Sequence, residues 1–184
     1  MADFTSEAIQ KSFIKLLNKM PVAQISVKDI CSDCGISRST FYYHYPGIPE
    51  LVESIARQCN DRIINEHPRI DSTIDCINAI TEFWLGNKKA ILHIYKSANR
   101  DIFERYLLDI CKFAVTTYLD TVSTGDDLSP DDRQILIDYM QSICLGVTIF
   151  WLENNLDNKI HDNIQRICDI KQGDVQTLIA RFKK

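Results

Sequence analysis

Apolar residues recur at helical spacing along almost the whole of this 184-residue chain. In residues 5–20, for example, they fall at i, i+4, i+7, i+8 and i+11, which places them on one face of a helix. That set consists of Ile9, Phe13, Leu16, Leu17 and Met20. We find no run that alternates with the period of two typical of a half-buried strand. The pattern therefore predicts an all-α protein.

Proline, glycine and capping residues divide this pattern into separate helices. Ser26 and Ser37 are suited to cap two short helices, Gly35 is suited to end the first of them, and Ser129-Pro130 is a strong helix start. The predicted helices span 5–20, 27–34, 38–44, 50–65, 72–86, 88–97, 100–122, 130–154, 158–170 and 174–183.

Two of the predicted helices are short and close together. The segments 27–34 and 38–44 are separated by a turn that contains Gly35, which is the arrangement of a helix-turn-helix. Ile30 and Phe41 can close a small core with Phe13 of the preceding helix. We therefore expect a three-helix domain over residues 1–48 and a larger helical domain over residues 49–184.

The net charge of −4 and the isoelectric point of about 5.5 exclude a whole-protein attraction to nucleic acid. Any binding to nucleic acid must therefore come from a local patch. Residues 1–49 hold five basic and four acidic residues, whereas residues 50–184 hold 16 basic and 21 acidic ones. The amino-terminal quarter is thus the less acidic part of the chain.

Seven cysteines, at positions 31, 34, 59, 76, 111, 144 and 168, lie mostly inside apolar helical patterns. We interpret them as reduced thiols, because their scattered positions do not form a disulfide framework. Cys31 and Cys34 form one CxxC pair, but no second pair or nearby pair of histidines accompanies it. We therefore expect no metal and no cofactor.

The sequence also bears on the location of the chain. Its amino terminus lacks the basic and apolar regions of a signal peptide. The longest apolar run, at 143–152, is about half the length of a membrane helix. We expect a cytoplasmic protein with no membrane partner.

The run FYYHY at 41–45 follows Ser-Arg-Ser-Thr and crowds rings into a chain that is only 9% aromatic. If Phe41 faces the core, the other side of the helix is exposed. That side carries donors and flat hydroxylated rings, which suit base edges, sugars and phosphates in a major groove. It consists of Arg38, Ser39, Thr40, Tyr42, Tyr43 and His44. The same face could instead be a solvated surface that contacts a protein.

The stretch ISVKDICSDCGISRSTFYYHYPGIPEL at 25–51 resembles the DNA-binding domain of the TetR family of bacterial transcriptional regulators. The resemblance covers roughly residues 5–65. It implies that double-stranded operator DNA is bound by Lys28, Ser37, Arg38, Ser39, Thr40, Tyr42, Tyr43 and His44. One departure is Ile48, because the family commonly has a lysine there, at the start of its fourth helix, which helps to hold a phosphate.

For the larger domain the resemblance is one of architecture, and it implies ligand binding and dimerisation. We expect a small molecule among the helices between 72 and 122, bordered by the long helix 130–154. The candidate pocket residues are Trp84, His93, Tyr95, Phe103, Tyr106, Phe150 and Trp151. Each of them could equally be plain core.

The helices 130–154 and 158–170 look like the pair that forms the family's four-helix dimer interface. The candidate interface residues are Tyr139, Ile143, Gly146, Ile160, Ile164 and Ile167. Gly146 inside a helix is unfavourable by about 1 kcal/mol relative to alanine. Either a close approach of two helices or a pocket wall would explain it.

The chain shows no catalytic constellation: it has no HExxH, no nucleophile elbow and no glycine-rich phosphate loop. We therefore do not expect an enzyme. The resemblance implies a homodimeric, ligand-responsive repressor that binds a palindromic operator. The alternative is a helix-turn-helix protein that acts through proteins, for example as a co-activator, without strong DNA binding. The sequence names neither the effector nor the regulated genes.

Overall fold

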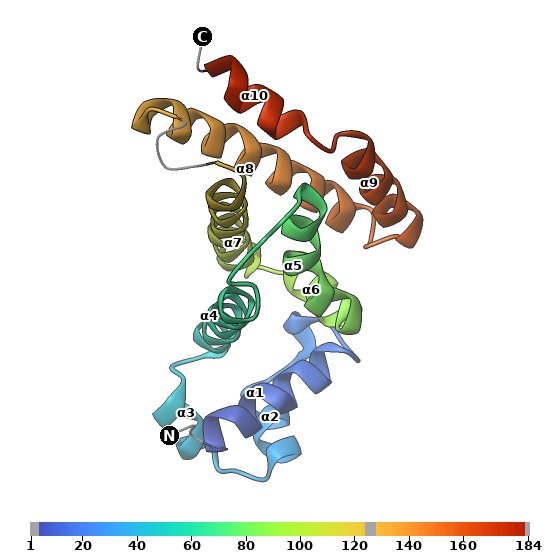
Figure 1. Cartoon of the computed structure of the whole chain (residues 1–184). Helices are drawn as coiled ribbons and strands as arrows, with labels where there is room; N and C mark the ends of the chain where they lie inside the picture. Colours follow the sequence, from blue (N-terminus) through green and yellow to red (C-terminus); the bar gives the residue numbers. More distant parts are fainter. Residues whose placement is uncertain (1–3, 124–127, 183–184) are drawn as a thin grey trace. The chain divides into compact units, whose positions relative to one another are not determined.

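The computed structural model describes residues 4–123 and 128–182. Within these residues it contains ten α-helices and one 3-10 helix, and no strand, which confirms the predicted all-α class (Figure 1). The helices are α1 Phe4–Leu17, η1 Val22–Gln24, α2 Val27–Cys34, α3 Arg38–His44, α4 Ile48–Glu66, α5 Thr73–Gly86, α6 Lys88–Tyr95, α7 Arg100–Val122, α8 Pro130–Glu153, α9 Asn158–Ile170 and α10 Asp174–Phe182.

Most helix bounds agree with the prediction, and α2, α3, α7 and α9 agree with it at both ends. The main difference is α1, which ends at Leu17 and not at residue 20. The Asn18 side chain donates to the carbonyl of Ile14 at 3.0 Å, and the Lys19 N–H donates to the Leu16 carbonyl at 2.8 Å in a tighter, three-residue turn before Pro21. The 3-10 helix Val22–Gln24 was not expected, because Pro21 predicted only the end of the preceding helix.

The described residues pack into two compact units. The first unit contains residues 4–60 and 86–106, and the second contains residues 61–85, 107–123 and 128–182. This division differs from the predicted one, 1–48 and 49–184, because two later segments pack with α1. Gln10 of α1 donates to Ser54 of α4 at 3.3 Å, and His93 of α6 lies against the end of α1. The functional assignment of residues 1–48 stays a prediction.

The first unit has a core built from α1, α2, α3 and the start of α4. Phe13, Ile30, Phe41 and Leu51 are completely buried, as expected for the first three. Tyr45 is also buried, and its hydroxyl accepts a hydrogen bond from Gln10 Nε2 at 3.0 Å. Because the core holds one face of each short helix, α2 and α3 leave their other faces to solvent.

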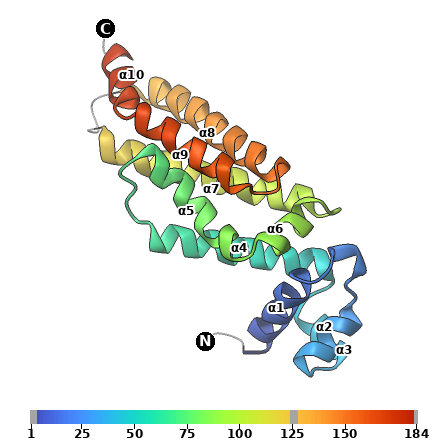
Figure 2. The ribbon, with the colours of Figure 1, turned by 90° about the vertical axis from the view of Figure 1, so that its right-hand side faces the viewer.

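The second unit is organised around α8, beside which α9 returns (Figure 2). A tight turn makes this return possible, since Asn155 and Leu156 have φ values of 56° and 52°. Trp151 is buried next to the turn, and its Nε1 donates to the carbonyl of Asp157 at 2.8 Å. The Asp157 side chain then caps α9 by accepting from Lys159 N at 2.9 Å.

The helix α8 contains an 18-residue window with a mean hydropathy of 1.6, which could cross a membrane by length and composition. This window contains polar residues, so it is longer than the longest unbroken apolar run, at 143–152. However, 39% of the window is buried inside the structure. Such a window is also typical of the core helix of a globular domain.

Candidate nucleic-acid interface

Local interactions at both ends of α2 place it in the helix-turn-helix. Ser26 and Asp29 form a capping box, in which Asp29 N donates to Ser26 Oγ at 3.3 Å and Ser26 N donates to Asp29 Oδ2 at 2.9 Å. The Ser26 hydroxyl also donates to Asp29 Oδ2 at 2.6 Å, and this bond, together with the one from Ser26 N, lowers the pKa of Asp29. At the other end Gly35 adopts a φ of 73°, in the left-handed region that favours glycine.

Hydroxyl groups cluster at the start of α3. Ser37 caps the helix by accepting from Thr40 N at 3.0 Å. Its Oγ also lies 2.7 Å from Ser39 Oγ and 2.8 Å from Thr40 Oγ1. Ser37 and Ser39 are exposed and Thr40 is half-buried. The capping role therefore orients three hydroxyls at the amino-terminal end of α3, where a helix in a major groove meets the DNA.

The two faces of α3 differ sharply in exposure. Phe41 is 0% exposed, whereas Tyr42 is 55% and Tyr43 is 86% exposed. The Phe41 and Tyr42 rings meet edge to face, with centroids 5.5 Å apart. His44 is half-buried, and its ring centroid lies 5.2 Å from that of Tyr43. The structure thus gives α3 the outward aromatic face that the sequence predicted.

The helix-turn-helix itself contains two cations, Lys28 and Arg38, and Lys15 lies on the preceding helix. Lys15 pairs with Asp33 at 2.6 Å, and this contact lowers the pKa of Asp33. Lys28 and Arg38 are exposed, and neither forms an ion pair with any residue that the structure describes. Their positive charges are available to an anion such as a phosphate.

Cys31 and Cys34 lie on α2 close to this interface. Burial raises the pKa of both thiols, and Cys34 Sγ donates to the carbonyl of Ile30 at 3.1 Å. Among the residues that the structure describes, no group of three or more His, Cys, Asp or Glu side chains could hold a metal ion. The two thiols are therefore held as protonated, hydrogen-bonded groups. The absence of a metal and of a cofactor stays a prediction.

The seven predicted pocket residues are divided between the two units. His93, Tyr95, Phe103 and Tyr106 belong to the first unit, whereas Trp84, Phe150 and Trp151 belong to the second. Tyr95 is buried between Phe103, at a ring distance of 5.9 Å, and Arg100, whose guanidinium lies 4.2 Å from the Tyr95 ring. Tyr95, Phe103 and Arg100 thus pack against one another, and the role of the seven residues in ligand binding stays a prediction.

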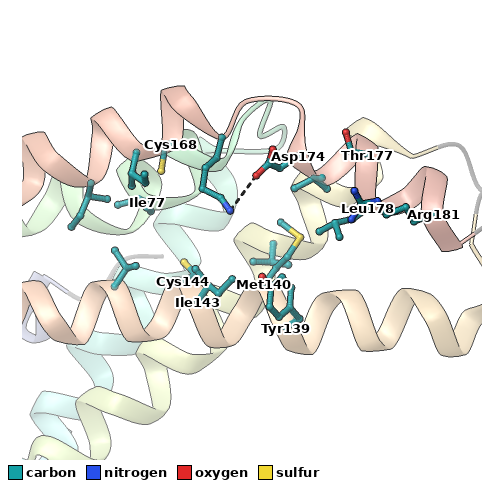
Figure 3. A pocket seen from close by; sticks show the side chains of 16 residues that line it. Ile77, Tyr139, Met140, Ile143, Cys144, Cys168, Asp174, Thr177, Leu178 and Arg181 are labelled. Carbon is teal, nitrogen blue, oxygen red and sulfur yellow. Dashed lines mark ion pairs between the residues drawn. The ribbon is translucent and has the colours of Figure 1, made fainter.

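In the second unit a cavity of about 540 Å³ lies among α5, α7, α8, α9 and α10 (Figure 3). None of the seven predicted pocket residues lines it. Four of the six predicted dimer residues do, namely Tyr139, Ile143, Ile164 and Ile167. The sequence missed this cavity because its apolar lining has the same helical spacing as a helix–helix contact.

One face of α8 carries an exposed apolar stripe, which consists of Ile135, Tyr139, Ile143 and Phe150. Gly146 is exposed on the same face, and no described atom lies within 4 Å of a Cβ built on it. The spacing of four, four and seven residues keeps these side chains in line. The same spacing could have assigned Phe150 to this stripe, in place of the predicted pocket.

Ile160 of the predicted interface is half-buried on α9, and Ile164 is buried, whereas Ile167 is 50% exposed. Tyr139, Ile143 and Ile167 are therefore both exposed and part of the cavity lining, whereas Gly146 is exposed and lies outside that lining. Their role in dimerisation stays a prediction.

Comparison with known proteins agrees with this geometry. The family model TetR_C_8, described as a transcriptional regulator C-terminal region, matches residues 71–173. The uncharacterized HTH-type transcriptional regulator YxbF of Bacillus subtilis (strain 168) is 41% identical over 96 residues, which are 51% of this chain and 23% of YxbF. The HTH-type transcriptional regulator EthR of Mycobacterium tuberculosis (strain ATCC 25618 / H37Rv) is 37% identical over 59 residues, which are 32% of this chain and 26% of EthR.

The matched part of the chain thus spans about a quarter of the length of these curated relatives. Among solved structures, the dihydroxyacetone kinase operon activator DhaS has a similar fold, with a TM-score of 0.65 over 91% of this chain and 97% of DhaS, at 19% identity. These relatives are named as regulators and not as enzymes. The family match over more than half of the chain, together with the helix-turn-helix geometry, shows that this protein belongs to the TetR family of transcriptional regulators.

Proposed function

We propose that this regulator binds double-stranded operator DNA as a homodimer in the cytoplasm, and that a small molecule alters this binding. The observation that carries the proposal is the two-sidedness of α3, which buries Phe41 and exposes Tyr42 and Tyr43. The two adjacent exposed rings form an apolar surface that carries hydroxyls, and a DNA groove offers both apolar sugars and hydrogen-bond acceptors to such a surface.

The chemistry of the exposed side chains supports this role. The Arg38 guanidinium is unpaired within the described residues and has the fork geometry for a guanine edge. Thr40 and His44 would contact phosphates, and Ser37 and Ser39 would add hydroxyl donors at the helix start. Lys28 would reach a phosphate or a base at the edge of the groove.

The exposed apolar stripe on α8 supports the proposal of a homodimer. Two copies that bury this stripe against each other would be related by a two-fold axis. Their α3 helices would then enter successive major grooves about 34–36 Å apart, so the operator would be palindromic. An effector would act by binding more tightly to one separation of the two helices than to the other. By occupying its operator the dimer would act as a repressor.

The test begins with DNA that flanks the gene for this protein. We expect the purified protein to protect an inverted repeat there from nuclease digestion. In a gel-shift titration on that repeat, Tyr42→Ala and Thr40→Ala should each weaken binding by about tenfold, because each removes a contact worth roughly 1–3 kcal/mol. The matched control is Lys112→Ala, an exposed change on α7. Unchanged affinity in both α3 variants would overturn the proposal.

The second candidate function is a co-activator that contacts only proteins. Ile48 favours it, because α4 begins there without the lysine that would help to hold a phosphate. A salt titration separates the two functions. Binding through several phosphates must weaken steeply as salt rises, whereas a protein-only module would show no DNA affinity at any salt concentration.

A further inference from the structure

The cavity in the second unit has the dimensions of a small-molecule site. Its volume of about 540 Å³ falls within the range of about 300–1,000 Å³ that ligand pockets occupy. Ile77 of α5 and Val115 of α7 belong to its lining and are themselves buried. The cavity is therefore lined by residues of five helices, and its lining includes buried side chains of α5 and α7.

The interior of this cavity is apolar. Met140 and Val147 of α8, Ile164 of α9, and Val175 and Leu178 of α10 contribute aliphatic or thioether surface. Two thiols complete the lining, Cys144 and Cys168. Burial raises the pKa of Cys168, which keeps this thiol uncharged near neutral pH. This part of the cavity lining is uncharged and is therefore suited to bind an apolar group.

An ion pair lies where α9 meets α10, and a further charged side chain, Arg181, lies toward the other end of α10 (Figure 3). Lys171 Nζ lies 3.1 Å from Asp174 Oδ2, so these two charges compensate each other. Arg181 also lines the cavity, is exposed, and forms no ion pair with a carboxylate in the described part of the chain. The lining therefore carries one uncompensated positive charge, on a side chain whose forked donors match a carboxylate.

We propose that this cavity binds a small amphipathic molecule with an apolar body and a single carboxylate. The apolar body lies between α8 and the α9–α10 pair, and the carboxylate meets Arg181. The inference deepens the proposed function, on which it rests for its regulatory meaning, because it names the site and the chemical class of the effector. The site differs from the pocket that the sequence predicted.

The test is a calorimetric titration of the full chain, without DNA, using three ten-carbon probes below their micelle-forming concentrations. We expect decanoate to bind saturably, at one molecule per chain, and at least about tenfold more tightly than decanol or decylammonium. Octanoate should bind about 15-fold more weakly than decanoate, because it lacks two methylenes and each buried methylene tightens binding by roughly fourfold.

Two variants locate the site. Arg181→Glu should weaken decanoate binding by at least about tenfold and leave decanol binding unchanged, since Arg181 is exposed and its loss does not disturb packing. Arg166→Glu is the matched control, because Arg166 is exposed on α9 and does not line the cavity. Val147→Phe should abolish binding of both probes by filling the cavity, with circular dichroism showing that the variant is folded.

Several outcomes would overturn the inference. The first is equal affinity for decanoate, decanol and decylammonium. The second is a loss of decanoate affinity in Arg166→Glu as large as that in Arg181→Glu. The third is undiminished decanoate binding by a folded Val147→Phe variant. Binding by a monomeric Phe150→Glu variant but not by a wild-type dimer would show that the partner copy fills the cavity. Operator protection without decanoate binding would remove this inference alone, whereas decanoate binding without any DNA affinity would remove the proposed function.

Discussion

His93 of α6 joins the end of α1, with its Nδ1 2.7 Å from the carbonyl oxygen of Leu17. The last carbonyls of a helix have no partner within the helix, so a side chain that donates to one of them stabilises that end. Through this contact α6 belongs to the same packing unit as the helix-turn-helix. The contact ties a helix of the predicted larger domain to the helices that carry the proposed DNA interface.

The first prediction concerns this contact. His93→Ala should lower the free energy of unfolding by about 1–2 kcal/mol, because it removes one hydrogen bond and leaves a part-buried carbonyl without its partner. Urea denaturation monitored by circular dichroism measures this change. Lys89→Ala, an exposed change on the same helix, should have an effect below about 0.5 kcal/mol. Equal effects of the two changes would contradict the prediction.

The second prediction concerns the turn of the helix-turn-helix. Gly35 has a φ of 73° and no described atom lies within 4 Å of an added Cβ, so Gly35→Ala should cost only backbone strain. That strain is about 1–2 kcal/mol. Gly35→Asn should cost less, since asparagine tolerates this conformation. The control is Gly86→Ala, which has equal space but no positive φ. Thermal unfolding should therefore show the largest loss of stability for Gly35→Ala, a smaller loss for Gly35→Asn and the smallest for Gly86→Ala.

The third prediction tests the apolar stripe of α8. Ile135→Glu and Phe150→Glu should each raise the dimer dissociation constant by more than about tenfold, because each places a charge in a contact that excludes water. Both residues are more than half exposed and neither lines the cavity, so the variants should stay folded. Sedimentation equilibrium measures the association.

The control for the third prediction is Gln134→Glu, which adds the same charge on α8 outside the stripe. A dimer that resists both stripe variants would move the interface elsewhere. Gly146→Ala tests whether two helices approach closely at this position. In a monomer the change should stabilise α8 by about 1 kcal/mol. If the dimer brings backbones together at Gly146, the same change should weaken association.

The fourth prediction concerns pH. Hydrogen bonds from Ser26 hold the pKa of Asp29 below its ordinary value of 3.8. Asp29 therefore stabilises the folded form at pH values above 3.8, and this stabilisation is lost as the pH falls through the lower pKa of the folded state. Asp29→Asn removes the titration but keeps an oxygen acceptor. The melting temperature of this variant should fall less between pH 7 and pH 3 than that of the wild type. Asp61→Asn is the control, and its melting temperature should fall as much as that of the wild type.

The sequence was sufficient where a local interaction decides the structure. Ser26, Ser37 and Ser129 cap their helices as predicted, and Gly35 takes the positive φ expected of it. These interactions join residues within three or four positions of each other, so they can be recognised in a single stretch of chain. The family motif at 25–51 has the same character, and its family assignment is confirmed.

The sequence was insufficient to predict which of two adjacent apolar residues is buried. Phe150 and Trp151 are adjacent in α8 and both were predicted to line a pocket, yet Phe150 is 58% exposed and Trp151 is 1% exposed. A step of one residue turns a helix by about 100°. The return of α9 decides which ring is covered, since His161 lies over Trp151 at a ring distance of 5.0 Å.

The sequence by itself determined that this chain is helical, where most of its helices begin and end, and that its second short helix presents hydroxyls and rings. Helical periodicity and capping involve residues that are close in the sequence, so they can be recognised from the sequence alone. Only the tertiary structure decided that α6 packs with the helix-turn-helix and that a cavity lies within the second unit. Both depend on contacts between residues far apart in the chain, and an apolar residue shows the same spacing whether it meets a helix, a partner copy or a ligand.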